Sequence, residues 1–252
     1  MSKVSSNSSA DRGGGAFLST RWSLVITARG PTSTVAQSAL DELCRIYWYP
    51  LYCFIRRRGY TPADAEDLVQ GFFVHMFRRH FFEQADPAQG RLRGFLLQSL
   101  DYFLTDQHRH QAAIKRGGEV EIVPLDLTGV QERYSHEPAT NETPEECYDR
   151  QWALLLLQRV IATLGEMWRQ KGKAELYAAL TPYFYAELDG ANAEALAIRF
   201  RMTTDNMKKI LSRLKDDFRA VFHQEVRDIV ATPADAEAEI AAFRAALRGR
   251  AV

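Results

Sequence analysis

Hydrophobic residues recur three and four positions apart along most of the chain, which is the spacing of an α-helix that buries one face. The first such run comprises Leu40, Leu43, Cys44, Tyr47, Leu51, Phe54 and Ile55. A second run comprises Leu68, Phe72, Phe73, Met76 and Phe77, and a third comprises Phe95, Leu96, Leu100, Phe103 and Leu104. A short stretch at 120–125 looks extended. The pattern predicts an all-α protein.

Three helix starts share one design. Thr61, Thr143 and Thr232 are each followed by proline and, three residues after the threonine, by an acid. The threonine hydroxyl can accept from free main-chain amides, proline fits the first helical turn, and the acid faces the positive end of the helix. With Glu146, Thr143 also forms a capping-box pattern. We therefore expect helices to begin at 62, 144 and 233.

The helical pattern is interrupted once by a polar stretch. Gly117 and Gly118 break the helix, and few hydrophobic anchors follow before Thr143. A short amphipathic helix at 233–248 has Ile240, Phe243 and Leu247 on one face. We expect a disordered N-terminus at 1–19, a helical domain at 20–116, an extended linker at 117–142, a second helical domain at 143–230 and a C-terminal helical tail at 231–252.

Composition narrows the class of protein. Of the 252 residues 46% are hydrophobic, which is enough for two buried cores. The 32 basic and 32 acidic residues cancel, so nucleic acid could be bound only through local basic stripes. Neither a secretory signal nor an apolar run long enough to span a bilayer is visible. These features predict a cytoplasmic protein without membrane association.

Residues that carry chemistry are sparse. Cys44, Cys53 and Cys147 are too scattered for a disulfide framework or a zinc site, and we expect buried thiols. The six histidines show no metal-ligand spacing, and no glycine-rich phosphate loop precedes a helix. The sequence therefore predicts no enzyme activity, no metal and no cofactor.

Residues 192–215 have the pattern of a helix-turn-helix. A short helix at 192–200 is followed by a turn at 201–203 and a longer helix from Thr204. The second helix of this motif enters the major groove of DNA by its N-terminal end. Met207, Ile210, Leu211 and Leu214 would pack inward. The side chains left to meet DNA are Asn206, Lys208, Lys209, Ser212 and Arg213. A plain amphipathic helix with a solvated basic face is the alternative.

A second basic region lies between Arg91 and Arg116, where Arg91, Arg93, Arg109, Lys115 and Arg116 outnumber Asp101 and Asp106. The aromatic residues Phe95, Tyr102 and Phe103 are interleaved. Basic and aromatic residues together suit single-stranded DNA, because cations meet the backbone and rings stack on bases. For Phe95 and Phe103 we favour the alternative of core packing, since they share a helical face with leucines.

Taken in order, these segments resemble the extracytoplasmic-function type of sigma factor of bacterial RNA polymerase, in the sigma-70 family. The segment DAEDLVQ at 64–70 looks like the polymerase-binding motif of that family. The segment at 90–97 is similar to the start of the helix that contacts the minus-ten promoter element, and 193–215 resembles the helix-turn-helix that reads the minus-thirty-five element. The resemblance covers about 23–229 and implies a region 2 helical bundle and a region 4 helix-turn-helix domain.

The resemblance implies a role for each segment. The side chains that dock on core RNA polymerase would be Asp64, Glu66, Asp67, Leu68 and Gln70. Those along the path of DNA on the minus-ten side would be Arg91, Arg93, Gln98, Arg109 and Lys115. The loop at 82–90 would hold a flipped base, and the acidic linker at 117–142 would thread through the polymerase. Promoter DNA and core polymerase are thus the expected partners, and the sequence leaves open an anti-sigma factor.

The sequence also departs from the family pattern. Gly71 stands where the family often has glutamate, Arg201 stands near a glycine of the usual turn, and 188–191 precede the helix-turn-helix unusually. The tail at 231–252 lies outside the two-domain pattern. Two alternatives to a sigma factor stay open: a stand-alone helix-turn-helix regulator, and a polymerase-binding adaptor that does not read promoters.

Overall fold

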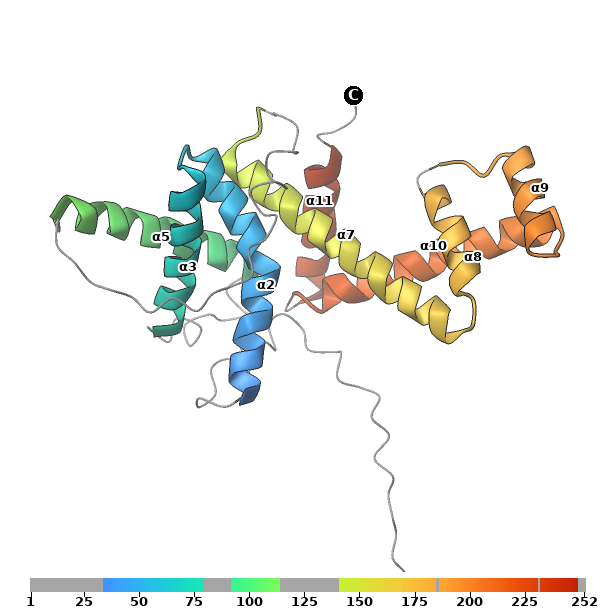
Figure 1. The fold of residues 1–252 in the computed structure, drawn as a ribbon, viewed down its shortest axis with the longest axis horizontal. Coiled ribbons are helices and arrows are strands. Elements are labelled where there is room, and N and C mark those ends of the chain that lie inside the picture. Colours follow the sequence, from blue (N-terminus) through green and yellow to red (C-terminus); the bar gives the residue numbers. More distant parts are fainter. Residues whose placement is uncertain (1–33, 79–91, 114–140, 185, 231, 249–252) are drawn as a thin grey trace, which may run out of the picture.

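The computed structural model describes residues 34–78, 92–113, 141–184, 186–230 and 232–248, and every element that these residues form is a helix (Figure 1). The predicted all-α class is confirmed for this part of the chain. In chain order the elements are α2 (Thr34–Arg57), α3 (Pro62–Arg78), α5 (Leu92–Ala113), α7 (Pro144–Gln170), α8 (Ala174–Leu180), the 3₁₀ turn η2 (Thr181–Phe184), α9 (Gly190–Arg199), α10 (Thr204–Arg227) and α11 (Pro233–Arg248).

Several predictions fall outside the described residues. They are the disordered N-terminus at 1–19, the loop at 82–90, the extended stretch at 120–125 and nearly all of the linker at 117–142. The two-domain division with a linker therefore stays a prediction.

The helix starts follow the local chemistry that the sequence predicts. The main-chain amides of Asp64, Glu146 and Asp235 each donate to the threonine hydroxyl three residues earlier, at 3.2 Å. At α7 the carboxylate of Glu146 also accepts from the main-chain amide of Thr143, which completes the predicted capping box. The predicted starts at 62, 144 and 233 are confirmed, because each depends on contacts within one turn.

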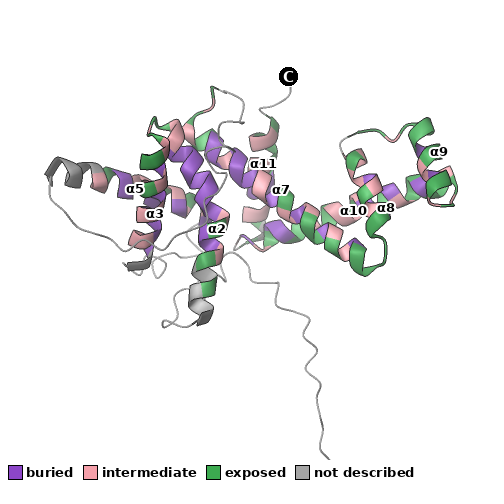
Figure 2. Ribbon diagram, viewed as in Figure 1, coloured by how far each residue is buried: buried purple, intermediate pink, exposed green. Residues whose placement is uncertain are grey.

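A first cluster of buried residues lies where α2, α3, α5 and the first half of α7 meet. Tyr47, Leu51 and Phe54 on α2 are almost fully buried, and so are Phe72 on α3 and Trp152 on α7. Figure 2 shows the buried positions concentrated along α2 and the adjoining half of α7. The end of α10 and the helix α11 close this cluster with Val226, Ile229 and Ile240.

A second, smaller cluster lies between the second half of α7, α8 and the first half of α10. Its buried members are Leu164, Trp168, Leu176, Leu180, Met207, Leu211 and Leu214. The helix α9 packs on α10 at the far end of this group, so α8, α9 and the start of α10 form a lobe at one end of the molecule (Figure 1).

The long helices α7 and α10 contribute to both clusters. The tail forms the predicted helix and packs against α7 and α10. Its Ile240 is buried, and Phe243 and Leu247 pack against the first cluster, so the predicted apolar face of this helix is confirmed.

Candidate functional site

The segment 64–70 begins in the first turn of α3 and occupies the N-terminal half of this helix. Ala65 and Val69 are fully buried and hold this part of the helix against the first cluster. Of the other side chains, Asp64 and Asp67 are exposed, and Glu66, Leu68 and Gln70 are half-buried, with Leu68 also packed against the first cluster. The five residues predicted to bind polymerase are therefore all at least partly accessible.

The start of α3 is held in place by its own cap. Thr61 accepts from the main-chain amide of Asp64, and its hydroxyl donates to the Asp64 carboxylate at 2.6 Å. The preceding Gly59 has φ of 90° and ends α2 in the left-handed conformation that glycine adopts without strain. This turn sets the angle at which α3 leaves α2.

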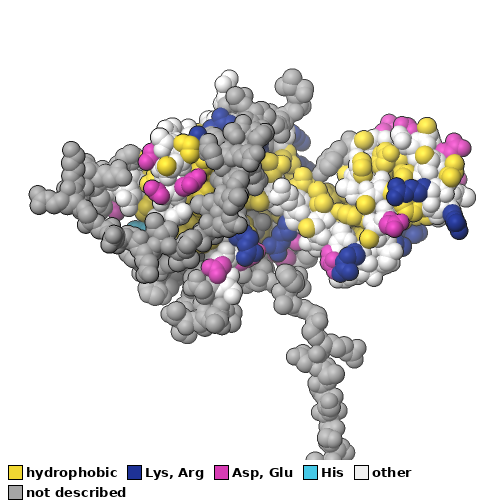
Figure 3. All heavy atoms as spheres, in the orientation of Figure 1, with side chains coloured by type: hydrophobic (Ala, Val, Ile, Leu, Met, Phe, Trp, Pro, Cys, Tyr) yellow, Lys and Arg dark blue, Asp and Glu magenta, His cyan; other side chains and the backbone are white. Residues whose placement is uncertain are grey.

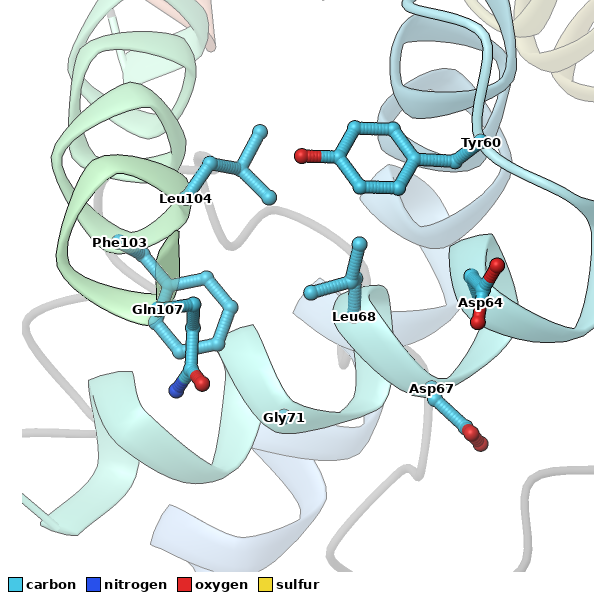
Figure 4. Close-up of a pocket in the computed structure, with 8 residues that line it drawn as sticks. All are labelled: Tyr60, Asp64, Asp67, Leu68, Gly71, Phe103, Leu104 and Gln107. Carbon is cyan, nitrogen blue, oxygen red and sulfur yellow. The ribbon is translucent and has the colours of Figure 1, made fainter. Parts of the chain in front are cut away.

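A hollow of about 380 Å³ lies between α3 and α5 beside this acidic face. Leu68 points into the hollow between Tyr60 and Leu104, whereas Asp67 points away from it (Figure 4). A methyl group on Gly71 would lie 3.4 Å from the ring of Phe103, so the position is in close contact with α5. The hollow therefore has a mixed lining, in which the apolar Leu68 lies near the carboxylate of Asp64. Such a pair suits a cationic side chain with an aliphatic stem.

The helices α9 and α10 have the predicted helix-turn-helix connectivity. Asp189 caps α9 by accepting from the main-chain amide of Asn192 at 2.8 Å, and the two hydrogen bonds from Asn192 hold the pKa of this carboxyl below its ordinary value. The segment 188–191, which looked unusual in sequence, therefore contains the cap of α9. Thr203 caps α10 in the same way, accepting from the amide of Asn206.

The turn between these helices is closed by Arg201 in the left-handed conformation, with φ of 52°. The amide of Met202 donates to the carbonyl of Ala197 at 2.9 Å, and the amide of Arg201 donates to the carbonyl of Ile198 at 3.2 Å. This is the hydrogen-bond pattern of a Schellman motif. The backbone thus makes the turn that the sequence left in doubt, although the residue is arginine instead of glycine.

The two faces of α10 divide as predicted. Met207, Leu211 and Leu214 are buried, and Ile210 packs beside them in the second cluster. The side chains predicted to meet DNA are all exposed, namely Asn206, Lys208, Lys209, Ser212 and Arg213. Basic and acidic side chains both occur over this lobe (Figure 3). The basic face of α10 is therefore local, as expected for a chain with no net charge.

The helix α10 is tied to α7 by polar contacts as well as by the second cluster. The indole nitrogen of Trp168 donates to Asp217 at 3.0 Å. Arg159 on α7 forms an ion pair with Glu225 at 2.6 Å, and Glu225 also accepts from Thr163. These contacts hold the helix-turn-helix lobe in one orientation relative to the first cluster.

The predicted DNA-facing residues near α5 are more dispersed. Gln98 is exposed, whereas the side chain of Arg93, on the first turn of α5, is largely buried. The side chains of Arg91, Arg109 and Lys115 lie outside the described residues. Phe103 is buried and Phe95 packs against the first cluster, so their predicted core role is confirmed. Tyr102, by contrast, is 65% exposed.

Arg93 lies in a network that the sequence did not reveal. Its guanidinium donates to Glu239 of α11 at 2.8 Å and to Asp149 of α7, and it lies 4.7 Å from the ring centroid of Trp152. Burial opposes its charge, but Glu239 and Asp149 outweigh that effect and raise the pKa of Arg93. Glu239 precedes Phe243 by four residues and so shares the apolar side of α11, a spacing that could have indicated its burial.

Other chemistry is not evident in the described part of the chain. The three cysteines are free and buried as predicted, and burial raises the pKa of the Cys44 thiol to about 12, which leaves it protonated and unreactive. Among these residues no group of His, Cys, Asp and Glu could hold a metal ion. None of the helices described here is both long and apolar enough to cross a membrane.

Comparison with known proteins adds no relative: no protein-family model, curated protein or solved structure matches the chain.

Proposed function

We propose that this protein is a sigma-type transcription initiation factor that binds core RNA polymerase and directs it to promoters. The observation that carries the proposal is the accessible face of α3. The segment 64–70 reads DAEDLVQ; its Asp64 and Asp67 are exposed, and its half-buried Leu68 points into the hollow between α3 and α5.

The docking surface combines two kinds of contact. The half-buried Leu68 offers apolar area that loses water on binding, and the exposed Asp64 and Asp67 offer charge beside it. A basic, amphipathic helix of the polymerase would match both. Gly71 has no side chain, so at the neighbouring turn the polymerase would contact the main chain of α3 directly and would meet no charge.

The second support is the form of the α9–α10 lobe. Thr203 and Asn206 lie at the N-terminal end of α10, the end that enters the major groove in helix-turn-helix proteins. Lys208, Lys209 and Arg213 follow on the exposed side, where they can meet phosphates or guanine edges.

The proposed mechanism uses binding energy and no bond chemistry. One module docks on polymerase and contacts the minus-ten side of the promoter, while the helix-turn-helix contacts duplex DNA upstream. Tethering makes the second contact effectively intramolecular. Because the chain has no net charge, we expect weak DNA binding by the free protein and strong binding by the holoenzyme. A sigma factor of this kind would act in the cytoplasm.

The decisive experiment is co-purification with bacterial core polymerase followed by transcription in vitro on genomic fragments. Asp67→Arg reverses a charge on the docking face, and Leu68→Glu places a charge in an apolar contact, so each should abolish co-purification and transcription. Glu175→Arg, at an exposed acid on α8, is the matched control and should behave as wild type. Wild-type binding by Asp67→Arg would contradict the proposal.

The helix-turn-helix favours a second candidate, a stand-alone DNA-binding regulator. In that case the isolated chain would bind a specific DNA site tightly without polymerase, and Asp67→Arg would leave that binding unchanged. An adaptor that binds polymerase without reading promoters is distinguished by co-purification without transcription. The same set of proteins therefore separates the three functions.

A further inference from the structure

Arg93 is enclosed by two acidic residues from two different helices. Its side chain is 10% exposed, and Glu239, its partner on α11, is 2% exposed. Asp149 on α7 is more accessible, at 39%. The hydroxyl of Tyr148 donates to the main-chain carbonyl of Arg93, so the start of α5 is held to α7 as well. The guanidinium thus has its donors directed at carboxylates in this conformation.

The helix that supplies Glu239 is the last described element of the chain. It follows the end of α10 after a short turn and lies against α7 and α10 (Figure 1). Most of its sixteen residues are small or charged, and its large hydrophobic side chains are Ile240, Phe243 and Leu247. The chain passes through all the other helices of the first cluster before it reaches α11. The helix α11 can therefore detach while the connections between those helices stay intact.

The stability of a buried ion pair depends strongly on both partners remaining in contact. Removing water from both ions costs free energy, which the pair recovers only while the two groups stay in contact. An arginine that loses a buried carboxylate is best stabilised by another anion, and its planar donors fit a phosphate as well as a carboxylate. Glu239 and a DNA phosphate would thus compete for the same donors of Arg93.

We propose that α11 is an intramolecular latch that keeps Arg93 from DNA in the free chain. Glu239 occupies the guanidinium while α11 is docked. Displacement of α11 uncovers Arg93, and the phosphate backbone near the minus-ten element then takes the place of Glu239. Asp149 stays on α7 and retains one water-exposed contact with Arg93. This inference rests on the proposed function, because it assigns DNA as the competing anion.

The test uses the full-length protein with Glu239→Gln, and Glu237→Gln at an exposed acid of the same helix as the matched control. Hydrogen exchange of the amides of 234–248 in the free chain reports opening of α11. Promoter affinity of the holoenzyme reports release of Arg93. For Glu239→Gln we expect faster exchange in α11 and promoter affinity raised by about tenfold, within the usual range for a coupled equilibrium. Arg93→Gln in the same chain should remove that gain.

The outcomes distinguish the latch from the function on which it rests. If the wild-type holoenzyme transcribes and Glu239→Gln opens α11 without raising promoter affinity, the latch is wrong and the function stands. Unchanged exchange in Glu239→Gln would also overturn the latch, because the ion pair would not hold α11. If no holoenzyme forms, the proposed function fails and the latch fails with it.

Discussion

At the scale of the single residue, Arg201 shows how a local conformation can be imposed on an unfavourable side chain. Its left-handed backbone is the one that glycine adopts after α7, where Gly172 has φ of 69° and makes the same pair of hydrogen bonds. A side chain in this region is strained by contact between its Cβ and the following carbonyl. The packing of Met202 in the second cluster offsets that strain.

Replacing Arg201 with glycine should therefore stabilise the fold. We expect the free energy of unfolding to rise by about 0.5–1 kcal/mol, since relief of strain exceeds the entropic cost of glycine in the unfolded chain. Urea unfolding followed by circular dichroism measures the change. Arg213→Gly, in the middle of α10, is the control and should lower stability by about 1 kcal/mol. Equal effects at the two positions would show that the turn carries no strain.

Asp189 is a second residue whose effect is local. Its folded pKa is lowered by the hydrogen bonds from Asn192, so its cap is fully present above the ordinary pKa of aspartate and is lost as the pH falls through the lower folded value. We expect the amides at the start of α9 to lose protection from exchange below about pH 4. Asp189→Asn should keep the cap without this pH dependence, and Asp189→Ala should lack it at every pH. A pH profile shared by wild type and Asp189→Asn would disprove the assignment.

At the scale of the element, two glycines within helices, one in the first turn of α5 and one inside α7, are expected to respond in opposite directions. Alanine generally favours a helix over glycine by about 1 kcal/mol. A Cβ on Gly94 of α5 would meet no atom within 4 Å, whereas a Cβ on Gly165 of α7 would lie 3.0 Å from the ring of Tyr177. That ring is held in place, because the Tyr177 hydroxyl donates to the carbonyl of Ile161 at 2.8 Å.

We therefore expect Gly94→Ala to raise the free energy of unfolding by about 0.5–1 kcal/mol, and Gly165→Ala to lower it by about 1 kcal/mol through displacement of α8. Thermal and urea unfolding of the two variants provide the measurement. Stabilisation by Gly165→Ala would mean that α8 moves aside freely. The contact between α7 and α8 would then be looser than the distance indicates.

The helices that carry the candidate sites could be located from sequence, but their surroundings could not. The apolar face of α10 followed from its spacing, and the start of α3 followed from Thr61 and Asp64. Arg93 also has the sequence features of an exposed basic residue. Its burial follows from the packing of Glu239, which is 146 positions away in the chain, and no pattern within α5 carries that information.

At the scale of the whole molecule, α7 and α10 join the two clusters of buried residues. Each helix has one half in each cluster, and Arg159 and Glu225 bridge them along the way. Loss of either cluster would expose apolar surface on a helix that the other cluster needs. The clusters should consequently unfold together.

We expect a single transition in urea, with the same midpoint for amides of α2 and of α8 when each is followed by hydrogen exchange. Leu164→Ala, at a fully buried position of the second cluster, should lower the free energy of unfolding by about 2–5 kcal/mol and shift both midpoints equally. An earlier midpoint for α8 alone would indicate two independent units. The division predicted at residue 143 would then be nearer to the behaviour of the protein.

The sequence by itself determined the helical class, the capped helix starts and the inward faces of α10 and α11, because hydrogen bonds and spacing within a few turns decide these features. Only the tertiary structure decided that α7 serves both clusters and that α11 covers Arg93. Those outcomes depend on which surfaces meet after the helices have formed. The hydrophobic effect is non-directional and does not specify which apolar surfaces must meet. The sequence therefore could not show that Trp152 and Arg93 contact each other, which follows only from how the helices pack.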